Sequence, residues 1–133
     1  MPKLSCVLLV DDDATTNFLN KLLLESLEVA EQLLVVENGA EALALLLQVC
    51  LPEATGCPAL ILLDINMPIM NGVAFLEAYQ QLPLPQPPVI VVLTTSMNAP
   101  ELARLQQLPI AGVLSKPLTR EKVAGLLQQH FTA

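Results

Sequence analysis

The apolar residues of this chain fall into short runs, and most of the runs end in a residue that can carry chemistry. The runs are residues 6–10, which lead into Asp11; residues 59–63, which lead into Asp64; residues 89–93, which lead into Thr94; and residues 110–114, which are followed closely by Lys116. Runs of this length between turn residues are typical of strands buried on both faces of a parallel sheet. Because the carboxyl ends of parallel strands lie along one edge of the sheet, we expect these polar side chains to share one crevice.

Between and after these runs, apolar residues recur at the spacing of a helix face in four segments. The segments carry Phe18, Leu19, Leu22, Leu23 and Leu27; Ala42, Leu43, Leu46 and Leu47; Val73, Leu76, Tyr79 and Leu82; and Val123, Leu127 and Phe131. Asn98, with Pro100 in the first turn, predicts a further short helix that stops before Pro109, and Thr119 is a candidate cap for the last helix.

With a shorter apolar run at residues 33–36, five strands alternate with five helices. This order predicts an α/β fold: a doubly wound, five-stranded parallel sheet with right-handed crossovers and helices on both faces. The length of 133 residues, with 53% hydrophobic and 14% charged residues, indicates one compact domain.

The charge and hydropathy exclude several kinds of partner. A net charge of −7 with only six basic residues leaves no basic patch that follows a phosphate backbone, so we expect no nucleic-acid partner. No apolar stretch approaches the ~20 residues of a membrane span. The first apolar run is too short for a secretory signal. These features predict a cytoplasmic protein with no membrane partner.

The cysteines allow two interpretations. A disulfide between Cys50 and Cys57, which flank a predicted loop, is one of them. Three cysteines and one histidine, His130, have neither the number of a disulfide scaffold nor the spacing of a zinc site. Free thiols in a reducing compartment are therefore the favoured prediction, with Cys6 inside a buried strand.

The acidic residues indicate a cation. Two carboxylates ~5 Å apart repel each other by roughly 3 kcal/mol at an effective dielectric constant of ~20. If Asp11, Asp12 and Asp64 meet at neighbouring strand ends, protons or a cation must offset that repulsion, and an all-oxygen cluster suits Mg²⁺. Taken alone, residues 11–13 are typical of a solvated turn after a strand.

The remaining strand-end residues complete the requirements of phosphoryl transfer. A carboxylate such as that of Asp64 can be a nucleophile and form an aspartyl phosphate. The transferred group carries charge on three equatorial oxygens, which need a metal, an ammonium and hydroxyl donors. Lys116 can pair with one oxygen and the Thr94 hydroxyl with another. Taken singly, Lys116 is typical of a strand-end lysine that reaches to solvent, and Thr94 of an ordinary strand residue.

Together these segments resemble the motifs of the bacterial response-regulator receiver domain, of the stand-alone, CheY-like kind. The motifs are VDDD at 10–13, LDINMP at 63–68 followed by MNG at 70–72, VLTT at 92–95 and SKP at 115–117. The resemblance covers essentially the whole chain. It implies a flavodoxin-like fold of receiver topology, over residues 1–133 as a single domain with no output domain.

The resemblance also implies a role for each residue of the site. Asp64 is expected to be the phosphoacceptor, and Asp12 a direct Mg²⁺ ligand. Asp11 would bind the ion largely through water, and Asn66 through its backbone carbonyl. Thr94 and Lys116 would contact the phosphoryl group, and the bond between Lys116 and Pro117 would be cis. Asp13 is expected to face away from the metal.

The resemblance further implies a signalling module rather than an enzyme acting on a separate substrate. Such a module catalyses its own phosphorylation and dephosphorylation, with a sensor histidine kinase or a histidine phosphotransfer protein as donor and an unknown protein as downstream partner. The resemblance does not distinguish three roles for the receiver in its pathway: an adaptor, a phosphorelay intermediate or a phosphate sink. The family commonly has an aromatic switch residue three positions before the lysine, where this chain has Val113, so the usual ring rotation does not carry over.

Two alternatives belong to other classes. The pattern of Asp11, Asp13 and Thr15 also resembles the nucleophile motif of haloacid-dehalogenase-type phosphatases, with Asp11 as nucleophile. That family needs a further acidic pair at a strand end after the lysine, and only Glu121 follows Lys116. A flavodoxin-like flavin binder would need flanking aromatic residues and a phosphate-binding loop after the first strand, which this chain lacks.

Overall fold

The computed structural model describes residues 3–50, 56–82, 84, 87–95 and 99–131, and within them strands and helices alternate as the apolar pattern predicts. The elements are β1 (Leu4–Val10), α1 (Ala14–Ser26), β2 (Ala30–Val36), α2 (Gly39–Val49), β3 (Leu60–Asp64), α3 (Gly72–Tyr79), β4 (Val89–Thr94), α4 (Ala99–Gln106), β5 (Gly112–Ser115) and α5 (Arg120–Phe131). All strand pairs are parallel, in the order β2-β1-β3-β4-β5. The predicted doubly wound parallel sheet is therefore confirmed.

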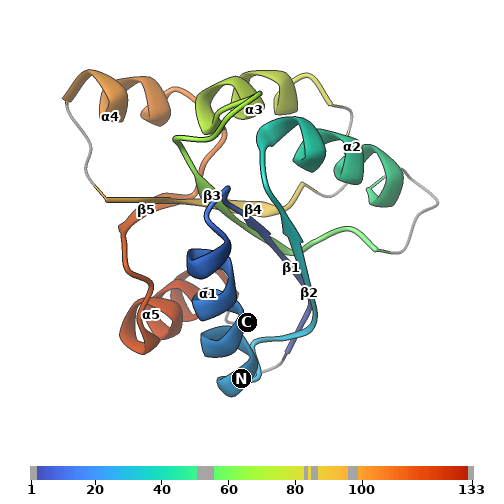
Figure 1. Cartoon of the computed structure of the whole chain (residues 1–133), viewed down its shortest axis with the longest axis vertical. Coiled ribbons are helices and arrows are strands. Elements are labelled where there is room, and N and C mark those ends of the chain that lie inside the picture. The colour runs from blue at the N-terminus through green and yellow to red at the C-terminus, as the bar shows by residue number, and fades with distance from the viewer. Residues whose placement is uncertain (1–2, 51–55, 83, 85–86, 96–98, 132–133) are drawn as a thin grey trace.

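Helices cover both faces of the sheet, with α1 and α5 on one face and α2, α3 and α4 on the other (Figure 1). Successive residues of a strand point to opposite faces, so the inner strands supply two separate cores. Leu8 and Ile61, which are register partners, pack on the side of α2 and α3. The next pair, Leu9 and Leu62, packs on the side of α1 and α5. The apolar runs are continuous because both faces of these strands are buried.

The edge strand β5 departs from the prediction of complete burial. It begins at Gly112 rather than at residue 110, and its four residues are partly buried or exposed. By contrast, all five residues of β3 are buried. The difference follows from position, because β3 lies between two strands whereas β5 pairs with β4 alone.

The helix predicted after the first strand is present, but the apolar spacing marks its buried face only in part. Leu23 and Leu27 pack against the core, whereas the other three marked residues lie at the surface. Phe18, Leu19 and Leu22 are exposed, with relative exposures of 62%, 57% and 48%. The buried residues of α1 include Asn17 and Asn20. Helix α1 is turned so that the amide of Asn17 reaches the carbonyl of Asp11 at the end of β1, and that orientation leaves an apolar stripe at the surface.

The favoured prediction of three free thiols is wrong. Cys50 and Cys57 form a disulfide, and Cys6 is the free, buried thiol of β1. Cys50 ends α2 and Cys57 lies shortly before β3, so the two Cα atoms are 4.5 Å apart, within the range that a disulfide bridges. In the described part of the chain, no helix is long and apolar enough to cross a membrane.

Candidate phosphoryl-transfer site

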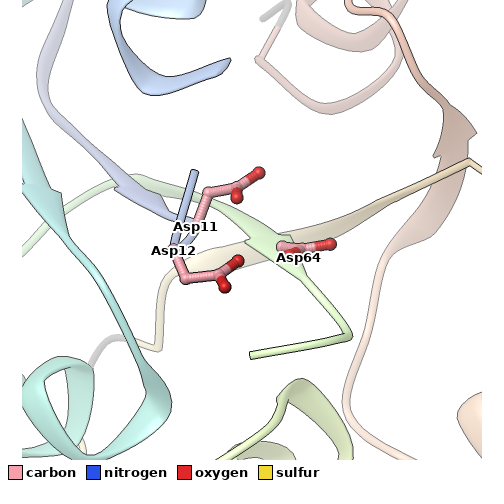
Figure 2. A group of neighbouring side chains, drawn as sticks. All are labelled: Asp11, Asp12 and Asp64. Carbon is pink, nitrogen blue, oxygen red and sulfur yellow. The ribbon is translucent and has the colours of Figure 1, made fainter. Parts of the chain in front are cut away.

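The acidic residues of β1 and β3 meet at the carboxyl edge of the sheet. Val10 pairs with Leu63, so the two strands end at the same level, with Asp11 and Asp12 after one and Asp64 at the end of the other. One carboxylate oxygen from each acid lies within 4.8 Å of the others. Figure 2 shows the three side chains extending to the same side of these strand ends. Asp11 and Asp64 are buried while Asp12 is exposed, so the cluster opens to solvent at Asp12.

The ammonium of Lys116 reaches this cluster from the loop after β5. Its Nζ donates to Oδ2 of Asp11 at 2.8 Å and to Oδ1 of Asp64 at 3.2 Å. Its backbone N–H donates to the carbonyl of Thr94 at 2.7 Å, which continues the pairing of β4 with β5. The Lys116–Pro117 bond is cis, as expected. The structure thus joins three segments that are distant in the sequence.

The other predicted site residues lie around the cluster. Asp64 pairs with Leu93, so the buried Thr94 stands one residue beyond the level of Asp64 on the neighbouring strand. Asn66 is exposed in the loop that follows Asp64. Val113 is partly buried in β5 and packs against the core on the side of α2 and α3.

The turn between β1 and α1 explains why Asp13 does not join the cluster. Its side chain is the N-cap of α1: the carboxylate accepts from the backbone N–H of Thr15 at 3.3 Å and from the Thr16 hydroxyl at 2.5 Å. The amide of Asn17 reaches back and donates to the carbonyl of Asp11 at 2.8 Å. Capping at Asp13 starts the helix directly after the acidic pair and fixes the direction in which Asp11 and Asp12 point.

Two glycines hold the segment that follows Asp64. A Cβ on Gly72, the first residue of α3, would lie 2.6 Å from the carbonyl oxygen of Asp64, and the backbone N–H of Gly72 donates to the carbonyl of Ile65 at 2.8 Å. Gly39, which starts α2, donates its backbone N–H to the carbonyl of Met70 at 2.9 Å. Only glycine permits so close an approach of a helix to the strand end.

The charges of the site act on one another strongly. Burial, followed by the charge of Asp11, raises the pKa of Asp64 above its ordinary value, against the opposite effect of Lys116. Burial opposes the charged form of Lys116, but its hydrogen bond to Asp11 and the two carboxylate charges outweigh this and raise its pKa. Lys116 is therefore a permanent cation at neutral pH.

The donor set of the cluster fits Mg²⁺. Its ligand atoms are all carboxylate oxygens, which is the chemistry that this hard cation prefers. One of the acids is exposed, so water can complete the coordination. The single ammonium of Lys116 forms hydrogen bonds with two of these acids, Asp11 and Asp64, and forms none with the carboxylate of Asp12. The residues present thus have the composition of a magnesium site.

Comparisons with known proteins agree with this geometry. Residues 7–128 match the response regulator receiver domain. The chain is 29% identical over 127 residues to the probable chemotaxis protein CheY of Rhizobium etli, which covers 96% of this chain and 92% of that protein. It is 32% identical over 110 residues to response regulator Rcp1 of Synechocystis sp., with coverage of 83% and 75%. A two-component response regulator from Cytophaga hutchinsonii superposes with a TM-score of 0.85 at 28% identity, over 96% of this chain and 97% of that one.

The fold and site therefore define a phosphoryl-accepting receiver of two-component signalling. The chain belongs to the response regulator receiver family, as its motifs predict. The comparisons give no support to the phosphatase alternative, in which Asp11 is the nucleophile.

Sequence reasoning missed two residues that build the site. Asn17 supports the carbonyl of Asp11, although it lies among apolar residues that predict an ordinary helix face. Lys122, in the first turn of α5, contacts the loop that carries Lys116. A lysine at that place in a helix is unfavourable to the helix dipole, and this was the one signal that the sequence offered.

Proposed function

We propose that Asp64 accepts a phosphoryl group with the help of Mg²⁺ and that the modified protein changes its affinity for a protein partner. One observation carries this proposal: Asp64 is buried beside a second carboxylate and bonded to the ammonium of Lys116. A fold has no structural need for such a group of charges, since burying them is costly. A transferred phosphoryl group needs all of them.

In the proposed reaction a carboxylate oxygen of Asp64 attacks phosphorus. The bond from phosphorus to the donor breaks, and its electron pair leaves with the donor, as acetate when acetyl phosphate is used. Lys116 then exchanges its contact with Asp64 for one with a phosphoryl oxygen, and the Thr94 hydroxyl donates to another. When held by Asp11, Asp12, Asp64 and the backbone carbonyl of Asn66, Mg²⁺ would offset the carboxylate charges and polarise a phosphoryl oxygen.

The same groups account for self-catalysed dephosphorylation. Water attacks phosphorus, the bond between phosphorus and the Asp64 oxygen breaks, and the carboxylate leaves with that electron pair while a proton passes to solvent. The protein is thus a signalling module whose chemistry acts on itself. Thr94 and Lys116 signal the modified state, because their contacts differ between the free and the phosphorylated protein and only such differences shift a conformational equilibrium.

The proposal extends to partners and place. A sensor histidine kinase or a histidine phosphotransfer protein supplies the phosphoryl group, and the chain acts as one receiver domain over residues 1–133. We place it in the cytoplasm with its donor. The Cys50–Cys57 disulfide argues against a cytoplasmic location, since such bonds are rare in a reducing compartment. Alkylation of the cysteines in cells, followed by non-reducing electrophoresis, tests the location. Alkylated free thiols would support a cytoplasmic location, and an intact Cys50–Cys57 disulfide would contradict it.

Labelling with acetyl phosphate tests the proposed chemistry. Wild-type protein should take up one phosphoryl group when Mg²⁺ is present and none when the metal is chelated. The Asp64→Asn variant keeps the size of the side chain but removes the nucleophile, so it should take up none in either condition. Equal labelling of the wild-type protein and the variant would contradict the assignment.

A further inference from the structure

A second lysine contacts the segment that carries Lys116. The Nζ of Lys122, in the first turn of α5, donates to the backbone carbonyl of Ser115 at 2.6 Å and to that of Pro117 at 2.9 Å. It also donates to the Ser115 hydroxyl at 3.1 Å. An ammonium has three N–H donors, so these oxygens engage its full capacity.

The two carbonyls belong to the residues on either side of Lys116. The peptide unit on its N-terminal side and the one after Pro117 are thereby tied to a single charged group. On the opposite side, the backbone N–H of Lys116 donates to the carbonyl of Thr94 at 2.7 Å. The main chain of Lys116 is thus held between the end of β4 and the start of α5.

The position of Lys122 in its helix argues for a specific role. Helix α5 begins at Arg120, and the Thr119 hydroxyl caps it by accepting from the backbone N–H of Lys122 at 3.2 Å. A cation in the first turn lies at the positive end of the helix dipole, where acidic residues are favoured. The contacts with the two flanking carbonyls compensate for this unfavourable place, because charge-assisted hydrogen bonds are the strong ones.

We propose that Lys122 is a positioning residue for Lys116: it fixes the loop from which the Lys116 ammonium reaches Asp64, and so sets where that ammonium meets the phosphoryl group. This inference rests on the proposed function for its chemical consequence. The positioning itself is a property of the free protein. It therefore has a test that needs neither metal nor phosphoryl donor.

The first measurement is ¹³C relaxation of the lysine Cε groups in metal-free wild-type protein. The Cε of Lys122 should be as ordered as that of Lys116, and both should be more ordered than the Cε of Lys21, an exposed lysine of α1. In the Lys122→Met variant, which keeps an apolar stem, the Cε of Lys116 should become more mobile. A wild-type Lys122 as mobile as Lys21, or an unchanged Lys116 in the variant, would overturn the proposal.

The second measurement is the affinity for beryllofluoride, which stands in for the phosphoryl group, at saturating Mg²⁺. Lys122→Met should lower it by about tenfold or more, within the ~100-fold that a misplacement of ~1 Å can cost. Its affinity for Mg²⁺ alone should not fall, and Lys122→Arg should restore part of the loss. Lys21→Met is the matched control and should behave as wild type.

The outcomes separate the two proposals. An equal loss of Mg²⁺ and beryllofluoride affinity in Lys122→Met would mean general damage to the site and would overturn the positioning role. If the wild-type protein binds no beryllofluoride, the proposed function fails, and the relaxation measurement still decides whether Lys122 orders Lys116.

Discussion

Asp12 and Asp13 are neighbours in the sequence, yet their side chains have different roles. Asp12 belongs to the acidic cluster, whereas Asp13 caps α1. We expect Asp12→Ala to weaken Mg²⁺ binding by about 100-fold or more, since even residues behind a metal ligand cost ~10–100-fold. Asp13→Ala should leave Mg²⁺ affinity unchanged and lower the free energy of unfolding, as the loss of an N-cap does in other helices. Calorimetric titration and urea unfolding measure the two effects; a greater loss of Mg²⁺ affinity in Asp13→Ala would contradict the account.

Tyr79, at the end of α3, gives a pH-dependent prediction. Its ring stacks on Phe75 at a centroid distance of 5.7 Å, and no partner for its buried hydroxyl lies among the described residues. Burial raises the pKa of Tyr79 from its ordinary value of 10.0 to about 12. The folded state therefore favours the neutral phenol. This stability is complete below pH ~10 and is lost as the pH rises toward ~12.

Tyr79→Phe should accordingly raise the free energy of unfolding by about 1 kcal/mol at neutral pH, because it removes a buried polar group without a partner. The difference should widen between pH 10 and pH 12, where only the wild-type protein ionises. Since the chain has one tyrosine, phenolate absorbance reports on it alone. An ordinary titration of the folded protein near pH ~10 would refute the prediction.

At the scale of elements, the start of α3 depends on Gly72, because the space beside its Cα has no room for a side chain. A Cβ at Gly72 would overlap the carbonyl oxygen of Asp64, whereas a Cβ at Gly125 in α5 would meet no atom within 4 Å. Gly72→Ala should therefore destabilise the protein by about 1–3 kcal/mol and weaken Mg²⁺ binding. The matched Gly125→Ala should stabilise it by about 0.5–1 kcal/mol, because alanine is the better helix residue. Similar unfolding curves for the two variants would contradict the role of Gly72.

The elements themselves were largely predictable from the sequence, and their orientation was not. Apolar runs predict β1, β3 and β4 because strands buried on both faces leave no polar position. The same reasoning succeeds only in part for α1, where Leu23 packs against the core but Phe18 is exposed and Asn17 is buried. Apolar spacing shows that a helix has two faces, but the face that turns inward depends on contacts such as that of Asn17 with Asp11, which are set by the assembled fold.

At the scale of the whole molecule, the disulfide and the acidic cluster lie at opposite edges of the sheet. Cys50 ends α2 and Cys57 lies shortly before the start of β3, whereas Asp64 is at the end of that strand. Reduction should lower the free energy of unfolding by about 2–3 kcal/mol, the entropy of closing a short loop. It should leave Mg²⁺ affinity unchanged. Chemical unfolding with and without dithiothreitol, with Cys57→Ser as a second route, measures this; equal stability of oxidised and reduced protein would contradict it.

The composition of the site was predictable because each group ends an apolar run. Asp64 and Thr94 end β3 and β4, whereas Asp11 and Lys116 follow β1 and β5, and the fold fixes the order of these strands. Lys122 was not predictable in this way. It reaches the loop from a helix, and only the packing of α5 against the sheet brings its ammonium to the two carbonyls that flank Lys116.

The identity of the phosphorylated carboxylate tests the central claim most directly. Protein treated with acetyl phosphate and Mg²⁺ is reduced with borohydride, which converts a phosphorylated aspartate to homoserine, and the product is located by tandem mass spectrometry. The account predicts homoserine at position 64 alone. Conversion at position 11, as a phosphatase-like nucleophile requires, or no conversion at position 64, would contradict it.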